Sequence, residues 1–356
     1  MSSYEERAAS LGRVLGSGDG SAIRLAKQTS NLFRDRPTAA RDRVDVSAFD
    51  HVLEVNARDG WVDVEGMVTY ERLVDATLQF GVMPAVVPQL KSITIGGAVA
   101  GVGIEATSFR HGLVHESLLA IDVLLPDGRV LKCTRQNEHR ELFFGFPNSY
   151  GTLGYALRLR AQTIPVKPYV KIVRERFDDA RAFFGAIERA CNANGDFVDG
   201  VIFSQTEMYL NVGHFITDAP YLSDYTFEHI YYRSIREKPV DFMTVRDYLW
   251  RWDTDCSGAQ GTSSRKCRSF ASCMASNASI PGRTHGSCGG TRALALPAPS
   301  SDYVVLRVNR SSRMSTYRSS ALLNTATFIF ARLGSRRCGS ARSGHAPPHR
   351  VFLFTR

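Results

Sequence analysis

Residues 94–112 read TIGGAVAGVGIEATSFRHG, and glycine fills five of these nineteen positions. Glycine is used where the backbone must turn sharply or approach another group closely, because it has no Cβ. A phosphate is one such group, since backbone N–H groups can bind its oxygens directly. A second glycine pair follows at Gly151 and Gly154. The pattern predicts either a cofactor held against backbone or a tightly packed turn.

Two common nucleotide-binding motifs do not fit this segment. Gly101 and Gly103 begin a G-x-G pattern, but Ala106 occupies the third glycine position. The segment also lacks the strand-then-helix setting of a Rossmann motif, and no Gly-Lys-Ser/Thr ending of a P-loop is present. A glycine-rich cofactor site of this chain must therefore be of another kind.

The elements around this segment can be expected from pattern. Residues 52–56 (VLEVN) and 61–65 (WVDVE) alternate apolar and polar side chains around Asp59-Gly60, which predicts a hairpin. Thr69 is expected to cap a helix that runs to about Phe80. The other elements predicted in this part are helices at 4–16 and 138–144, strands near 23–25 and 83–87, a strand–turn–strand at 118–133, and a strand after Gly154.

From Tyr169 the pattern changes, and residues 167–168 are expected to mark a domain boundary. The new unit is predicted to contain strands at 169–177, 197–204 and 208–216. The helix between them is expected to place Ala180, Phe184, Ile187 and Cys191 on one face.

Charge divides the chain more sharply than these elements do. Residues 256–356 contain fourteen Arg, one Lys and a single acid, Asp302, whereas residues 1–255 contain 29 Lys and Arg against 34 Asp and Glu. Five of the seven cysteines also lie in the last 101 residues. Such a tail could bind nucleic acid or an acidic membrane, or ligate zinc, or be disordered. It could also be the product of a shifted reading frame.

The order of the elements and the two glycine motifs resembles the FAD-binding domain of the vanillyl-alcohol-oxidase (PCMH-type) flavoproteins. Within that group the chain is most similar to the delta-24 sterol reductase (diminuto/seladin) family. VPQLKSITIGGAVAGVGIEATSFRHGL corresponds to that family's P-x-L-x-x-x-T-x-GG-x-x-x-G-x-GIES-S segment. NSYGTLGYALRLRAQTIPVKPYVKI corresponds to its C-GTLGF segment, which ends in IP-x-x-YVK. The resemblance runs from about residue 23 to about residue 255.

This resemblance implies an α+β fold with four parts. Residues 1–22 are expected to form an N-terminal helix and extension, and residues 23–167 a two-subdomain, PCMH-type FAD-binding domain. Residues 168–255 are expected to form a truncated α+β cap domain over the substrate. Residues 256–356 are expected to be a largely irregular tail, frameshifted or disordered.

The resemblance also implies which residues bind FAD. We expect FAD to be bound non-covalently, because residues 27–36 contain neither His nor Cys. Small polar side chains in the expected pyrophosphate loop suit phosphate contact. The expected FAD-binding residues are Thr29, Ser30, Asn31, Thr94, Ile95, Gly96, Gly97, Ala98, Val99, Ala100, Gly101, Val102, Gly103, Ile104, Glu105, Ala106, Ser108, Gly154 and Tyr155.

The activity that the resemblance implies is reduction of a C=C bond in an apolar, sterol-like substrate, with NADPH as electron donor. The alternatives are a FAD-linked oxidase or dehydrogenase of an alcohol or sugar lactone, an inactive truncated flavoprotein, and a basic binding module that acts through the tail. Tyr231, Tyr232 and His229 are chemically able to donate a proton, and the sequence does not choose among them. Aromatic residues of the cap domain predict either a substrate pocket or a core: Tyr221, Tyr225, Phe227, Tyr231, Tyr232, Phe242, Tyr248, Trp250 and Trp252.

Location and partners follow from what the sequence lacks. The first twenty residues have no apolar core of a secretory signal, and no apolar run has the length of a membrane span. We expect a cytoplasmic protein, free or peripheral to a membrane, with no metal and no nucleic-acid partner.

Overall fold

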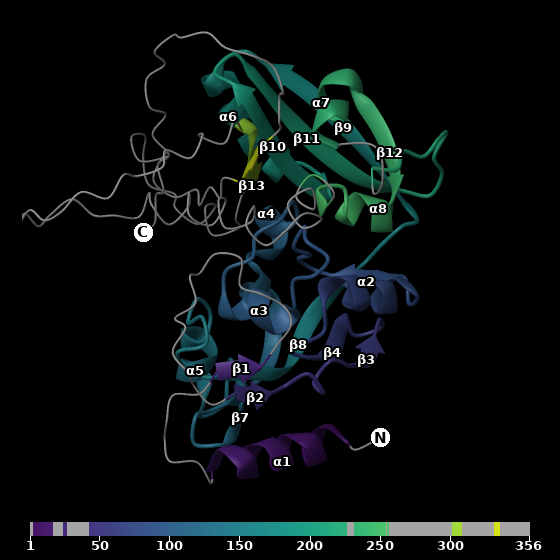
Figure 1. Ribbon diagram of the computed structural model, residues 1–356. Coiled ribbons are helices and arrows are strands. Elements are labelled where there is room, and N and C mark those ends of the chain that lie inside the picture. The colour runs from purple at the N-terminus through teal and green to yellow at the C-terminus, as the bar shows by residue number, and fades with distance from the viewer. Residues whose placement is uncertain are drawn as a thin grey trace, which may run out of the picture.

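The computed structural model describes residues 3–16, 24–26, 43–225, 231–253, 255, 301–307 and 331–334. They form two units, the first in the lower half of Figure 1 and the second in the upper half. The chain crosses between them after β8 (Tyr155–Pro165), and β9 begins at Tyr169. Both units mix helices with mainly antiparallel sheets, so the fold is α+β, as predicted.

An antiparallel sheet forms the centre of the first unit. The predicted hairpin is confirmed with its register, because Val55 pairs with Val62 and Asn56 with Trp61. A separate pair of short parallel strands, β1 (Arg24–Ala26) and β2 (Arg43–Asp45), lies beside this sheet. The order of strands across the sheet is β3 (Val52–Asn56), β4 (Trp61–Glu65), β8, β6 (Leu118–Leu124) and β7 (Val130–Thr134), and β5 (Val82–Pro84) pairs with β8.

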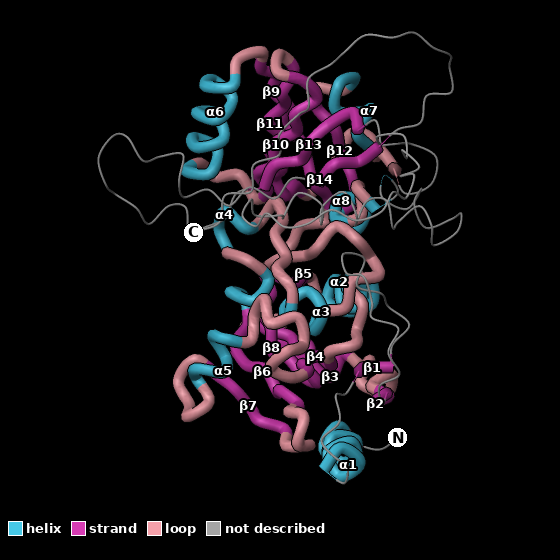
Figure 2. The backbone as a smooth tube through the Cα atoms, turned by 60° about the vertical axis from the view of Figure 1, so that its left-hand side comes forward, coloured by secondary structure: helices cyan, strands magenta, loops and turns pink. Residues whose placement is uncertain are grey.

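Short helices pack on this sheet and connect its strands (Figure 2). Thr69 caps α2 (Tyr70–Leu78) by accepting a hydrogen bond from the Arg72 backbone N–H at 3.4 Å. The glycine-rich segment itself forms two helices that the sequence did not predict. The helices of this segment and beyond are α3 (Ile95–Ala100), α4 (Ser108–His111), the 3₁₀ turn η1 (Val114–Ser117) and α5 (Arg140–Gly145).

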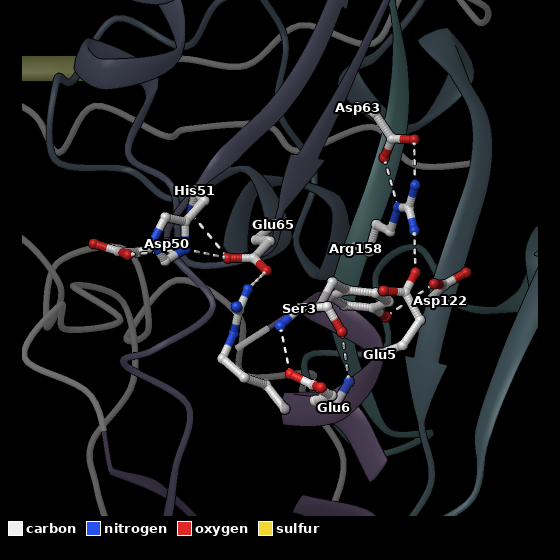
Figure 3. A network of polar contacts seen from close by, with 11 residues as sticks. Ser3, Glu5, Glu6, Asp50, His51, Asp63, Glu65, Asp122 and Arg158 are labelled. Atoms are coloured by element: carbon white, nitrogen blue, oxygen red, sulfur yellow. Dashed lines mark hydrogen bonds and ion pairs between the residues drawn. The ribbon is translucent and has the colours of Figure 1, made fainter. Parts of the chain in front are cut away.

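The predicted N-terminal helix, α1 (Tyr4–Gly16), is tied to the sheet by polar contacts (Figure 3). Tyr4 donates its hydroxyl hydrogen bond to Asp122 of β6 at 2.8 Å, and Arg7 pairs with the fully buried Glu65 of β4. Arg158 of β8 holds Asp63 at 2.8 Å. Burial disfavours the charge of Asp63, but the hydrogen bonds from Arg158 and Arg160 outweigh it and keep the pKa of Asp63 below its usual value.

The second unit is a sheet with helices α6 (Ala180–Asn192), α7 (Tyr231–Glu237) and α8 (Val245–Leu249). α6 buries Phe183, Ala186, Ile187 and Cys191. Of the four residues expected on one face of this helix, Ile187 and Cys191 are buried, but Ala180 and Phe184 are exposed, and Phe183 is buried in their place. The strand order is β12 (Val240–Thr244), β9 (Tyr169–Phe177), β11 (Glu207–Ile216), β10 (Phe197–Ser204), β13 (Ser301–Arg307) and β14 (Ala331–Gly334).

Two segments of the basic tail extend this sheet. β13 pairs antiparallel with β10, with Val305 opposite Val201, and β14 pairs with β13. The other tail residues lie outside the described part of the chain, so the assignment of 256–356 as frameshifted or disordered stays a prediction. Among the helices of the described residues, none combines the length and the apolar character needed to cross a bilayer.

Most of the cap aromatics belong to the core of the second unit rather than to an open surface. Tyr225, Tyr231, Tyr248, Trp250 and Trp252 are buried, and the Tyr231 and Trp252 rings meet edge to face at 4.7 Å between centroids. Tyr221 is instead 46% exposed. Of the three proton-donor candidates, Tyr231 is fully buried, Tyr232 is half-buried, and His229, like Phe227, lies outside the described residues.

Candidate cofactor site

The start of α3 is fixed to the turn that follows β4. Thr94 is buried, and its hydroxyl accepts a hydrogen bond from the Gly97 backbone N–H at 3.2 Å. The Gly96 N–H donates to the Gly66 carbonyl at 2.9 Å. These two hydrogen bonds fix the position of the first turn of α3.

The glycines of the two motifs, at 94–112 and 151–154, serve two different purposes. A Cβ on Gly96 would lie 2.8 Å from the Gly66 carbonyl oxygen, and one on Gly103 would lie 2.6 Å from the Val114 side chain. Gly154, at φ +134°, would place a Cβ 2.5 Å from the Leu124 carbonyl oxygen. These three positions need glycine because protein packs against them.

Gly97 and Gly101 are less enclosed. Gly97 is exposed, and a Cβ there would meet only the Thr94 hydroxyl, at 2.9 Å. Gly101 is half-buried, and a Cβ there would lie 3.3 Å from the Gly97 carbonyl oxygen and 3.7 Å from the Tyr150 ring. Val102 beside it is 38% exposed. We call Gly97, Gly101 and Val102 the open strip, because side chains leave this backbone accessible.

The rest of the segment turns into the protein. Residues 104–109 are all buried. The Ala106 carbonyl accepts a hydrogen bond from the Val198 N–H of β10 at 2.9 Å, so the segment is joined directly to the second unit. Phe109, only 1% exposed, packs among Phe183 and Ile187 of α6. Arg110 adds a 2.7 Å hydrogen bond to the Gly195 carbonyl.

A small cavity lies where this buried part meets the second unit. Glu105 accepts a hydrogen bond from the Gln89 N–H at 3.0 Å, and Arg251 pairs with Asp199 at 2.8 Å. Burial alone lowers the pKa of Arg251, but nearby Tyr248, Tyr231, Asp199 and Glu105 outweigh it, so its pKa is raised and it stays charged. The lining residues are Met83, Val87, Glu105, Ala106, Thr107, Phe197, Tyr248, Leu249 and Arg251.

The structure thus brings some of the predicted site residues onto one accessible surface and buries others. Ala100 and Gly103 are half-buried at the margin of the open strip, and Tyr155 is half-buried at the start of β8. Thr29, Ser30 and Asn31 lie outside the described residues. The predicted residues that are buried are Thr94, Ile95, Gly96, Ala98, Val99, Ile104, Glu105, Ala106, Ser108 and Gly154.

Residues 22–134 match the FAD binding domain family. The chain carries an FAD-binding domain. The match contains the whole glycine-rich segment, with both the open strip and the buried residues 104–109. β8, which follows Gly151 and Gly154, lies beyond this match in the sequence but belongs to the same sheet.

The chain is also similar to curated proteins over about half its length. A delta(24)-sterol reductase of Pisum sativum is 29% identical over 192 residues, which are 51% of this chain and 34% of the relative. One of Arabidopsis thaliana is 30% identical over 187 residues, 50% of this chain and 33% of the relative. Cytokinin dehydrogenase 7 of Oryza sativa is 30% identical over 167 residues, which are 46% of this chain and 30% of the relative. The chain therefore spans about a third of the length of these relatives.

The accessible residues of the FAD-binding domain fit a flat aromatic cofactor. Gly97 and Gly101 of the open strip offer backbone without side chains, Val102 adds an exposed apolar side chain, and the ring of Tyr150 (45% exposed) lies next to Gly101. Exposed apolar side chains around accessible glycine are suited to contact with rings that bear an attached phosphate chain. Tyr150 is not among the residues expected from the sequence, because its residue type does not indicate that it lies next to Gly101.

The described residues offer no cluster of three or more His, Cys, Asp or Glu side chains that could hold a metal ion. Cys133, one of two free cysteines described, is buried in β7, and burial raises the pKa of its thiol to about 11. A protonated, buried thiol is a poor nucleophile.

Proposed function

We propose that the chain is a FAD-dependent oxidoreductase that reduces a carbon–carbon double bond in an apolar, sterol-like molecule, with NADPH as electron donor. The observation that carries this proposal is the FAD-binding domain together with the similarity to two plant delta(24)-sterol reductases. FAD, when bound, would supply the electron-transfer chemistry, and the protein would supply binding, orientation and exclusion of water.

In this proposal the open strip holds the cofactor without a covalent bond. Gly97 and Gly101 let the cofactor approach the backbone, and the polar side chains of Thr29, Ser30 and Asn31 contact its pyrophosphate. Cys133 does not compete as a point of attachment, because its thiol is buried and protonated.

The second unit would act as the cap over the substrate. It is joined to the FAD-binding domain by the Ala106–Val198 hydrogen bond and by Phe109, which fixes one edge of the cap relative to the cofactor segment. Phe197 and Tyr248 place apolar surface at the boundary between the two units. These two rings suit contact with a sterol-like substrate, and Glu105 and Arg251 add polar groups to the same boundary. We place the protein in the cytoplasm, at the surface of the membrane that would hold such a substrate.

A second candidate keeps FAD and reverses the reaction. The similarity to a cytokinin dehydrogenase favours a dehydrogenase or oxidase that takes electrons from its substrate. The substrates expected for such an enzyme are alcohols and sugar lactones. The two candidates differ in which compound reduces the bound flavin.

The test begins with the full chain, purified and examined for a flavin absorption spectrum. We expect a yellow protein that releases free FAD on acid denaturation. A colourless protein that FAD cannot reconstitute would contradict both candidates.

The second step adds NADPH, an alcohol or a sugar lactone to the yellow protein without oxygen. Bleaching by NADPH, followed by reoxidation with a sterol that has a side-chain double bond, supports the reductase. Bleaching by an alcohol or lactone alone supports the second candidate. Bound FAD with no turnover by any donor would indicate an inactive truncated flavoprotein.

A further inference from the structure

The loop before β8 has an unusual backbone. Asn148 has φ +60° and Tyr150 has φ +50°, and they are the non-glycine residues with positive φ in the described part of the chain. Asn enters this left-handed region readily, but a bulky side chain such as Tyr does so rarely. Gly151 (φ +85°) and Gly154 (φ +134°) continue the same loop. Backbone strain of this kind clusters at ligand-binding sites, because surrounding contacts must hold it.

Contacts with the open strip hold this conformation. The Tyr150 N–H donates to the Ala100 carbonyl at 2.9 Å, and the Asn148 N–H donates to the Gly101 carbonyl at 3.3 Å. The end of α3 therefore fixes the backbone position of Tyr150. The strained residue is anchored to the part of the chain that offers accessible glycine.

The Tyr150 ring lies over Gly101. Its Cε1 would be 3.7 Å from a Cβ on Gly101, which is van der Waals contact, yet the residue remains 45% exposed. Val102 of the open strip is 38% exposed, and Leu153, in the same loop as Tyr150, is 43% exposed. The ring of Tyr150 thus lies against Gly101, and the residue keeps 45% of its surface accessible. Such an arrangement suits a planar ring stacked on the tyrosine.

We propose that Tyr150 is a stacking platform for an aromatic ring of the cofactor that lies along Gly97 and Gly101. This proposal rests on the proposed function for the presence of FAD. FAD contains two planar ring systems, isoalloxazine and adenine, and both can stack on a tyrosine ring. In the sterol reductase motif that the sequence resembles, this position is Cys, so the platform is a feature of this chain.

The test compares FAD affinity in four full-length proteins: wild type, Tyr150→Ala, Tyr150→Phe and Phe80→Ala. Phe80 is the matched control, because it is a 56% exposed aromatic residue just after α2. Replacing an aromatic side chain on which a base stacks by alanine typically lowers the binding affinity by about 5- to 100-fold. We expect a loss in this range for Tyr150→Ala, and wild-type affinity for Tyr150→Phe and Phe80→Ala. Circular dichroism and thermal melts of the apo proteins check that all four fold.

A second readout distinguishes the two rings. A tyrosine in contact with isoalloxazine quenches flavin fluorescence, and phenylalanine does not. If isoalloxazine is the partner, Tyr150→Phe keeps the affinity but brightens the bound flavin, and FMN binding weakens in Tyr150→Ala. If adenine is the partner, brightness is unchanged in Tyr150→Phe, and ADP binding weakens in Tyr150→Ala.

Tyr150→Ala that binds FAD as tightly as the wild type and Phe80→Ala would overturn the platform while leaving the FAD-binding proposal intact. A folded wild-type protein that binds no FAD would overturn both. Loss of affinity in Tyr150→Phe equal to that in Tyr150→Ala would also contradict stacking, because phenylalanine retains the ring.

Discussion

The two halves of the glycine-rich segment differ in what surrounds them. Gly97, Gly101 and Val102 keep accessible surface, whereas residues 104–109 are buried against the second unit. In the first half, Gly97 and Gly101 leave backbone accessible. The second half meets β10 and α6 through the Ala106 carbonyl and the Phe109 ring. Glycine enrichment alone therefore does not identify an accessible surface, because Gly96 and Gly103 of the same segment are enclosed by protein.

This difference has a consequence for function. A segment that is open at one end and anchored at the other fixes the position of the second unit relative to the open strip through a few residues of one short stretch. Substitutions in the buried half should lower the stability of the fold, and those in the open half should lower FAD affinity.

Phe109→Ala should have the largest effect. The side chain is 1% exposed and packs in the cluster of α6, β10 and β11. Removing a buried phenylalanine costs about 3–5 kcal/mol, through lost burial and the cavity that remains. Denaturant titration of the full chain measures this loss. Phe80→Ala, at an exposed aromatic, is the control and should stay within about 0.5 kcal/mol. Equal stability of the two variants would show that α4 does not anchor the second unit.

Gly96→Ala should be next, at about 1–3 kcal/mol of lost stability. Its Cβ would lie 2.8 Å from the Gly66 carbonyl oxygen and 3.3 Å from that of Ala156, and backbone cannot move aside as a side chain can. Gly145→Ala is the matched control, because a Cβ there meets nothing within 4 Å. A thermal melt that is unchanged in Gly96→Ala would show that α3 can shift away from β8.

Glu105→Gln should lower stability by about 1 kcal/mol, because a hydrogen bond to a carboxylate is stronger than one to a neutral amide. The substituted amide keeps an oxygen for the Gln89 N–H but removes a negative charge that raises the pKa of Arg251. The exposed Glu54→Gln is the control, with no expected change. If urea midpoints are the same for both variants, the charge of Glu105 does not contribute to the boundary between the units.

The sequence predicted the parts of this architecture that depend on local pattern. The hairpin around Asp59-Gly60 and the Thr69 cap are confirmed, because alternation and capping act between near neighbours. The inward face of α6 was assigned one residue off at Phe184, because helical spacing does not reveal where the sheet lies. The strand expected at 83–87 is shorter, β5 ending at Pro84.

The candidate site was predictable as a segment but not as a surface. FAD binding follows from the two glycine motifs and is supported by the family match over residues 22–134. Which glycines are accessible depends on distant contacts, such as Gly96 with Gly66 and Gly103 with Val114. The positive φ of Tyr150 depends on its hydrogen bond to Ala100, and no short-range signal marks it.

Gly97→Ala is the smallest expected change in stability and the sharpest test of the open half. Gly97 lies within α3, where alanine is favoured over glycine by about 0.5–1 kcal/mol. Its Cβ would meet only the Thr94 hydroxyl, at 2.9 Å, and a small displacement of that hydroxyl offsets part of this gain. The apo protein should therefore unfold within about 1 kcal/mol of the wild type. FAD affinity should nevertheless fall, because the new methyl group stands on the accessible face that the cofactor would contact. Gly185→Ala in α6 is the matched helical control, with a flexible Arg189 side chain at 3.4 Å as its nearest neighbour, and should leave FAD affinity unchanged. Equal FAD affinity in Gly97→Ala, Gly185→Ala and the wild type, measured by fluorescence titration, would mean that the cofactor does not contact Gly97, and the open strip would lose its assigned role.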